Sequence, residues 1–213
     1  MAEALREAIF SGQVQPGQTL REAHLAVSLG VSQASVREAL MTLEHAGLVV
    51  RNNRETTVTR LTLADLHERV RLRANLESVA AADAATRLTD ADLEQLQRQL
   101  DAIHAALERD SYLDFVAADL DFHRVIWRLS GDRTLARILD IVSVPLFAFL
   151  SIRRSRALHN LARTVQSHDP IMEALRARSP EAAREALRAH IEGSYRRFQT
   201  EESLDLEATT APR

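Results

Sequence analysis

Apolar residues recur every three to four positions through most of residues 62–201, which is the spacing of amphipathic helices. The first helix is predicted to begin at Thr62-Leu63-Ala64-Asp65, a capping box, and to run to about Arg87. Further helices are predicted from Thr89, over 111–129, from Thr134, over about 162–178 and over 180–200. Pro145 is expected to kink or end the helix that begins at Thr134. This pattern predicts an antiparallel bundle of about six helices.

The first 60 residues have a different pattern, in which helical spacing gives way to short β-prone runs. Within residues 20–48, Ala26 is small where two helices would cross, and Gly30 can adopt the positive φ of a tight turn. Val36 falls on the apolar face of the second helix, and Ser32 is suited to be its N-cap. This spacing predicts a helix-turn-helix, whose second helix enters the DNA major groove N-terminus first. An ordinary helical hairpin without nucleic acid is the alternative.

Two β-prone runs, 48–50 and 56–59, follow the second helix and enclose a short polar segment. Asn52-Asn53 favours a turn there, because Asn tolerates the left-handed conformation. Arg51 and Arg54 flank this turn, where they could reach phosphates or the minor groove. A plain hairpin would explain the segment by itself, but after a helix-turn-helix the two runs predict a wing.

The predicted fold class is mainly α: a winged helix-turn-helix domain over 1–61 and an all-α antiparallel bundle over 62–201, with a disordered tail over 202–213 that lacks periodicity. Hydrophobic residues make up 46% of the 213 positions, enough to form the cores of two domains. The chain has no cysteine, which excludes disulfides, thiolate metal sites and cysteine nucleophiles. No signal peptide or long apolar run is evident, so a soluble cytoplasmic protein without membrane contact is expected.

The net charge of −3 does not support DNA binding, and residues 1–61 carry six arginines against six glutamates. The expectation of DNA binding therefore depends on motif geometry. Affinity would come from local arginines and from two domains acting together.

Histidine placement in the helical region is the chemical clue. Asp119 and His123 are spaced i, i+4, so both project from one face of the third predicted helix. His168 opens the fifth helix and His190 lies within the sixth. Three imidazoles and a carboxylate suit a divalent ion such as Zn²⁺, Ni²⁺ or Mn²⁺, with positions open for water or a ligand oxygen. From spacing alone, core histidines or a solvated Asp–His pair remain the simpler interpretation.

Residues 5–48 resemble the N-terminal domain of the GntR family of bacterial transcription regulators. The resemblance is carried by LREAIFSGQVQPGQTLREAHLA, by LGVSQASVREALMTLEHAGLV and above all by Val36-Arg37-Glu38-Ala39-Leu40. It implies a homodimer that reads a palindromic double-stranded operator. The residues expected at the DNA are Ser32, Gln33, Ser35 and Arg37 on the recognition helix and Arg51 and Arg54 on the wing. Two departures from the family pattern are Gln33, where Arg is usual, and Glu55, where Gly is usual.

Residues 66–200 resemble the all-helical FCD ligand-binding domain found in the FadR branch of that family. The matching motifs are Asp119-x-x-Phe122-His123 with Ser130-Gly131, the run His168, Ile171, Ala174, Leu175, and Ala189-His190. The resemblance implies a metal site formed by Asp119, His123, His168 and His190. It also implies that Arg73 meets the carboxylate of an effector, whereas a structural Arg–Glu salt bridge is the alternative. Arg153 and Arg154 are further candidates for that contact.

These observations predict a ligand-responsive transcriptional regulator, a repressor rather than an enzyme, that senses a small organic acid over a divalent metal. Effector oxygens would complete the coordination of the metal and shift the helices that carry the linker near residues 60–65. A metal sensor is one alternative. A metalloenzyme is another, but no serine or cysteine nucleophile motif accompanies these histidines.

Overall fold

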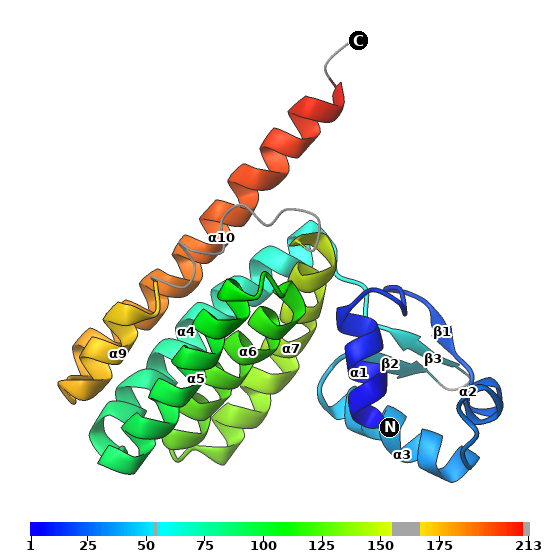
Figure 1. Cartoon of the computed structure of the whole chain (residues 1–213), viewed down its shortest axis with the longest axis horizontal. Helices are drawn as coiled ribbons and strands as arrows, with labels where there is room; N and C mark the ends of the chain where they lie inside the picture. Colours follow the sequence, from blue (N-terminus) through cyan, green and yellow to red (C-terminus); the bar gives the residue numbers. More distant parts are fainter. Residues whose placement is uncertain (53–54, 155–166, 211–213) are drawn as a thin grey trace.

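The computed structural model of the chain describes residues 1–52, 55–154 and 167–210, with side chains described to residue 152 in the second range and to 200 in the third. A small N-terminal domain precedes a helical bundle (Figure 1). The N-terminal domain contains α1 (Ala2–Phe10), β1 (Thr19–Leu20), α2 (Glu22–Leu29), α3 (Gln33–His45), β2 (Val49–Asn52) and β3 (Glu55–Val58). Its strands form an antiparallel sheet in the order β1-β3-β2, with Val49 opposite Val58 and Leu20 opposite Thr56.

The helix-turn-helix is formed by α2 and α3, and its local features match the sequence prediction. Gly30 ends α2 in the left-handed conformation with φ of +66°. The Ser32 hydroxyl accepts a hydrogen bond from the Ser35 backbone N–H at 3.1 Å and so caps α3. Val36 and Ala26 are both buried, which fixes the angle at which the two helices cross. The strands of the predicted wing are β2 and β3, whose connecting residues 53–54 lie outside the described part of the chain.

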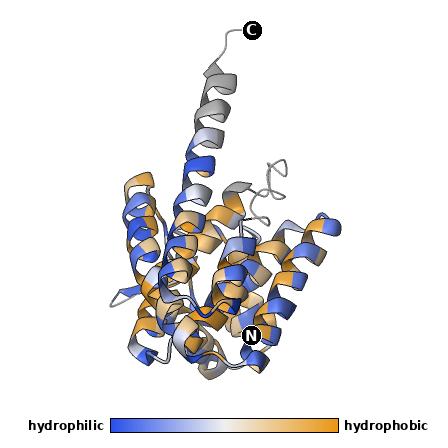
Figure 2. Cartoon of the chain, turned by 90° about the vertical axis from the view of Figure 1, so that its left-hand side faces the viewer, coloured by the Kyte–Doolittle hydropathy of each residue, from blue (hydrophilic) through white to orange (hydrophobic). Residues whose placement is uncertain are grey.

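The bundle contains α4 (Leu63–Arg87), α5 (Asp90–Glu108), α6 (Tyr112–Leu129), α7 (Arg133–Arg154), α9 (Asp169–Arg176) and α10 (Pro180–Thr210). Capping boxes at Thr62/Asp65 and Thr89/Asp92 start α4 and α5. Figure 1 shows α4 to α7 side by side, with α10 packed along α4 and continuing beyond the bundle. Figure 2 shows hydrophobic and hydrophilic residues alternating around the helices, as amphipathic packing requires.

The end of α10 differs from the pattern expected of a disordered tail over 202–213. Its backbone remains helical to Thr210. The segment from 202 to 210 has no apolar periodicity, but it contains several strong helix formers and neither glycine nor proline. Intrinsic propensity therefore carries the helix past the point where its amphipathic pattern stops.

Pro145 does not end α7, which continues through it to Arg154. A proline has no backbone N–H, so the carbonyl of Ile141, four residues earlier, loses its partner within the helix. Arg69 of α4 replaces that partner, because its Nη1 donates to the carbonyl oxygens of Ile141 at 2.9 Å and Val142 at 3.1 Å. A side chain from a neighbouring helix thus compensates for the interruption.

The same part of α7 contacts the N-terminal domain. Gly47, in the turn after α3, has φ of +71°, and a Cβ atom there would lie 3.1 Å from both the Ile141 carbonyl oxygen and Pro145 Cγ. Ser151 Oγ donates to the carbonyl oxygen of Phe10 at 2.8 Å, in a buried position. The N-terminal domain is therefore attached to α7 by close backbone contacts as well as by the linker into α4.

Within the described part of the chain, α7 is also the one helix that is long and apolar enough to cross a membrane by length and composition alone, over Arg133–Ile152. Half of that segment is buried within the structure. It packs against α4 and α6, so its apolar composition is accounted for by its central position in the bundle.

Candidate metal centre and nucleic-acid interface

The four predicted metal ligands lie together inside the bundle. Asp119 and His123 project from α6, His168 is the N-cap residue of α9, and His190 comes from α10. One ligand atom from each of the four lies within 4.8 Å of the others. All three histidines are buried, so the cluster is removed from bulk water. Helix packing thus unites residues that are separated by up to 71 positions in the sequence.

Distances within the cluster show how its donor atoms are arranged. His168 Nε2 lies 2.8 Å from Asp119 Oδ1, and His123 Nε2 lies 3.7 Å from the same oxygen. The rings of His168 and His190 have centroids 4.3 Å apart. His190 Nδ1 contacts the Ser167 hydroxyl oxygen at 2.8 Å, which orients this ring. One carboxylate oxygen therefore lies near two imidazoles and is hydrogen-bonded to that of His168, and the His190 ring lies close by at a tilt.

A second carboxylate, Glu77 of α4, lies behind the cluster. Glu77 Oε2 is 2.5 Å from His123 Nδ1, and its Oε1 accepts from Arg73 Nε at 2.5 Å. This contact gives His123 the tautomer with a proton on Nδ1 and leaves Nε2 as an electron-pair donor. His123 Nε2 is buried and has no hydrogen-bond partner among the described residues. The sequence pattern did not indicate Glu77 as a partner of His123, because no local signal connects it to a histidine 46 positions away.

The donor set fits a divalent metal ion. Two nitrogen or oxygen ligands bound at about 2.1 Å can be at most about 4.2 Å apart. The four donor atoms lie within 4.8 Å of one another, so the side chains would close by about half an ångström or more around an ion. The unpaired Nε2 of His123 and the hydrogen bond between Glu77 and that ring are the features that a ligating histidine shows.

Charges in the cluster hold its carboxylates in the ionised form. Burial by itself raises the pKa of Glu77. The Arg73 guanidinium and the His123 ring lower this pKa by more than burial raises it, so the net shift is downward. The pKa of Asp119 is likewise lowered despite its burial, by the hydrogen bond and charge of His168. Burial, together with the neighbouring histidines His168 and His123, lowers the pKa of His190 well below its usual value. With neutral imidazoles, two carboxylates and one guanidinium leave one net negative charge.

Arg73 forms the salt bridge with Glu77 that was the alternative to effector binding. Part of its guanidinium is nevertheless left without a hydrogen-bond partner among the residues that the structure describes. The side chain is buried, and its guanidinium carbon lies 4.5 Å from the centre of the Phe147 ring on α7. Its Nη2 has no hydrogen-bond partner within the described structure. A cavity of about 20 Å³ beside it, enough for roughly one water molecule, lies between α4, α7 and α10. The side chains of Arg153 and Arg154 are outside the described residues.

The residues expected at the DNA lie on the exposed face of α3 and on β2. Gln33 and Arg37 are exposed, and the hydroxyl oxygens of Ser32 and Ser35 lie 2.9 Å apart. Arg37 donates to Glu22 of α2 through Nε at 3.1 Å and through Nη2 at 2.9 Å.

Arg51 on β2 donates to the same Glu22 carboxylate at 3.0 Å, and Arg54 is outside the described residues. The hydrogen bond to Arg37 lowers the pKa of Glu22, although burial opposes the shift. Glu22 was absent from the sequence-based site. It is separated from these two arginines by 15 and 29 positions, and only the crossing of the elements brings them together.

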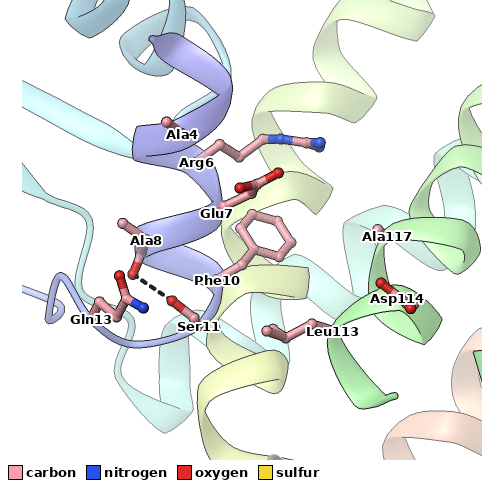
Figure 3. A pocket seen from close by; sticks show the side chains of 10 residues that line it. All are labelled: Ala4, Arg6, Glu7, Ala8, Phe10, Ser11, Gln13, Leu113, Asp114 and Ala117. Carbon is pink, nitrogen blue, oxygen red and sulfur yellow. Dashed lines mark hydrogen bonds between the residues drawn. The ribbon is translucent and has the colours of Figure 1, made fainter. Parts of the chain in front are cut away.

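A separate cavity of about 370 Å³ lies between the two domains. It is lined by α1, by the turn that follows α1 and by the start of α6 (Figure 3). Arg6, Glu7 and Phe10 project from α1, and Leu113 and Asp114 lie on the α6 side. None of the four clustered metal ligands lines it, and it carries charges of both signs.

Two family descriptions match the chain: "Bacterial regulatory proteins, gntR family" over residues 1–58 and "FCD domain" over residues 68–193. The HTH-type transcriptional regulator YdhC of Bacillus subtilis (strain 168) is 29% identical over 188 residues, which cover 87% of this chain and 84% of that protein. The "Probable D-xylose utilization operon transcriptional repressor" of Paenarthrobacter nicotinovorans is 32% identical over 184 residues, covering 86% and 80%. The solved structure of E. coli McbR/YncC matches with a TM-score of 0.78 at 24% identity, covering 94% of this chain and 96% of that one.

These matches, together with the fold, define a DNA-binding transcription regulator in which a helix-turn-helix domain precedes a helical domain. The chain belongs to the GntR family and carries an FCD domain at its C-terminal side. Regulators of this family bind DNA operators and typically dimerise, and FCD domains often bind metals. The expectation that the chain is not an enzyme is confirmed, because its relatives are transcriptional regulators.

Proposed function

We propose that this regulator binds one divalent metal ion per subunit through Asp119, His123, His168 and His190, and a small carboxylate effector beside it. The homodimer would bind a palindromic operator through α3 and the wing, and the effector would alter that affinity. The observation that carries the proposal is the buried cluster itself: four donor side chains from three helices within 4.8 Å, with the Nε2 of His123 unpaired.

The charge of the cluster supports the binding of a metal ion first and of an anionic effector second. Its residues carry one net negative charge when the imidazoles are neutral, and an uncompensated charge is costly in a buried site. A divalent ion supplies positive charge and open coordination positions for oxygen ligands. The site would then carry one net positive charge, which favours a monoanion over a neutral or cationic effector.

Arg73 supplies the second contact for such an anion. Its Nε is held by Glu77, so the guanidinium is oriented while Nη2 remains available. A charged donor without a partner among the described residues, on a residue that lines a small cavity, is suited to a carboxylate oxygen. The neighbouring cavity holds about one water molecule, so an effector would have to separate α4, α7 and α10 to enter.

The position of α7 suggests how the effector would reach the DNA-binding domain. Phe147 of α7 lies against Arg73, and the centre of its ring is 6.0 Å from that of His123, one of the four clustered residues. Two residues earlier, Pro145 lies against Gly47 of the N-terminal domain. A displacement of α7 at Phe147 would therefore change the position of α3 relative to the bundle. We expect the coupling free energy between effector binding and operator binding to be about 1–3 kcal/mol.

The test begins with elemental analysis of protein purified without chelators or a histidine tag, and about one divalent metal per subunit is expected. Operator binding is then measured with stripped and with reloaded protein, each with and without a panel of acetate, lactate, gluconate and succinate. The proposal requires a carboxylate to change operator affinity only in the loaded protein, and Arg73→Lys to weaken that response.

Two other outcomes are informative. If the metal alone changes operator affinity and no carboxylate in the panel does, the protein is a metal sensor. If the purified protein holds no metal, and adding Zn²⁺, Ni²⁺ or Mn²⁺ produces no thermal shift, the site assignment is wrong.

A further inference from the structure

Three charged side chains from three different elements meet on the surface of the N-terminal domain that is expected to face DNA. Glu22 is the first residue of α2, Arg37 lies on the recognition helix α3, and Arg51 lies on wing strand β2. Glu22 Oε2 accepts two hydrogen bonds from Arg37, at 3.1 and 2.9 Å, and Oε1 accepts one from Arg51 at 3.0 Å. One carboxylate thus links the recognition helix to the wing.

These contacts determine which donors of Arg37 remain free. A guanidinium has five N–H donors arranged as a planar fork. The Nε edge of Arg37 is directed to Glu22, and this leaves Nη1 and the second hydrogen of Nη2 for another partner. That remaining end can still bond the O6 and N7 atoms of a guanine. Glu22 therefore selects the edge of Arg37 that is presented to DNA.

The cluster is accessible rather than buried. The exposed fractions of the side chains are 57% for Arg37, 34% for Arg51 and 25% for Glu22. A groove between the start of α2 and the wing is lined by both Glu22 and Arg51. Exposed ion pairs contribute little to folding stability. The cluster is thus better explained by what it presents to a ligand than by what it contributes to the fold.

We propose that Glu22 is a positioning residue for DNA recognition, which holds Arg37 and Arg51 in one geometry and raises the ratio of specific to non-specific binding. Two free guanidiniums would bind phosphates of any sequence, and this attraction is non-specific and sensitive to salt. Glu22 removes one charge from that attraction and orients Arg37 for a base edge. The lowered pKa of Glu22 keeps the carboxylate ionised throughout the neutral range.

The experiment compares Glu22→Gln, Glu22→Asp and the control Glu38→Gln. Glu38 is exposed and follows Arg37 directly on α3, so the control removes the same charge from the same helix without breaking the cluster. Each protein is titrated against a duplex selected from a random library by the wild-type protein and against a scrambled duplex of the same composition. Thermal melting by circular dichroism verifies that each variant is folded.

Glu22→Gln should bind the scrambled duplex several-fold more tightly and the selected duplex about tenfold more weakly. Glu38→Gln should bind both duplexes slightly more tightly. Glu22→Asp keeps the charge but is one methylene shorter, so it should lose affinity for the selected duplex alone. Parallel changes on both duplexes for Glu22→Gln, in either direction, would overturn the proposal and reduce Glu22 to a surface charge or a structural residue.

Discussion

Two of the clusters in which carboxylates meet cationic or basic side chains, one in each domain, lie in opposite environments. In the bundle, Glu77 and its histidine and arginine neighbours are buried, whereas in the DNA-binding domain Glu22 and its two arginines are exposed to solvent. Desolvation makes every unmatched charge in the first cluster costly, while water and salt screen the second. We therefore expect the buried cluster to affect folding and the binding of the proposed ion, and the exposed cluster to affect the binding of DNA.

The largest effect is expected from removing a buried ligand. In His190→Ala, one of four donors is lost, so metal binding and its contribution to folding should both fall. An ion present at about a hundred times its Kd stabilises a protein by about 2.7 kcal/mol, so the melting temperature should drop by about 5–10 °C. Differential scanning calorimetry with added Zn²⁺ measures this change. His104→Ala, an exposed histidine on α5, is the control and should melt like the wild type.

The pH dependence of the free energy of unfolding, measured on the metal-free protein, tests whether the histidine cluster is buried as described. The pKa of His190 in the folded protein is lowered, chiefly by burial, so unfolding allows this ring to take up a proton. The unfolded state then binds more protons below about pH 6.5, and the free energy of unfolding should decrease as the pH falls through that value. His190→Ala should flatten this part of the curve. Identical profiles for the variant and the wild type would show that His190 is not desolvated as described.

Arg69 is intermediate between the two clusters in its exposure to solvent, because it is half-buried. Its hydrogen bonds go to carbonyl oxygens rather than to a charged group. Arg69→Met would leave the Ile141 and Val142 carbonyls without that donor, at a cost of about 1–3 kcal/mol in the free energy of unfolding. Urea denaturation measures the loss. Arg71→Met, at an exposed position on the same helix, should change it by less than about 0.5 kcal/mol. Equal effects for the two variants would mean that Pro145 needs no compensation.

For the exposed cluster the expected changes are in binding rather than in folding. Arg37→Ala should weaken binding to a selected operator about tenfold, because a guanidinium that can bridge a guanine edge is removed. Its affinity for random duplex should change much less, and the melting temperature should stay close to that of the wild type. Competition between the two duplexes gives the result directly. Equal losses on both would assign Arg37 to a phosphate.

The smallest effect is expected at the wing. Glu55 is exposed at the start of β3, paired in register with Asn52, where a passing phosphate would be repelled. Glu55→Gly should tighten binding modestly and steepen the dependence of log K on log salt by up to about one, as one more phosphate contact becomes possible. Glu55→Gln separates the charge from the added flexibility of glycine. An unchanged slope in both variants would place the wing away from the DNA.

Local signals in the sequence predicted the elements well, because caps and turns depend on neighbouring residues. Thr62, Thr89 and Ser32 start their helices as predicted, and Gly30 has the positive φ that was expected. Two expectations differ from the structure: the tail after residue 201, which remains helical to Thr210, and the proline in α7, which does not end its helix. The effect of the proline depends on Arg69, which lies 72 positions from Ile141, and spacing alone could not indicate that contact.

The sites were predictable to different degrees. Spacing placed Asp119 and His123 on one helix face but could not show that His168 and His190 lie near them. The family resemblance implied that the four form one site, and the packing of α9 and α10 brings them together. Glu77 and Glu22 were missed for the same reason: each acts on a residue of another element. A carboxylate that orients a ligand or an arginine has no fixed sequence distance from it, so only the three-dimensional structure identifies it.

The junction of Gly47, Pro145 and Arg69 limits how freely the two domains can be exchanged between relatives. Gly47 packs on the Ile141 carbonyl oxygen that Pro145 leaves without a helical partner, and Arg69 bonds to that same oxygen. A chimera that imported only a foreign DNA-binding domain would bring its own residue at position 47 against an unchanged α7. These three residues therefore form one packed unit that crosses the domain boundary, and a functional domain swap should transfer them together.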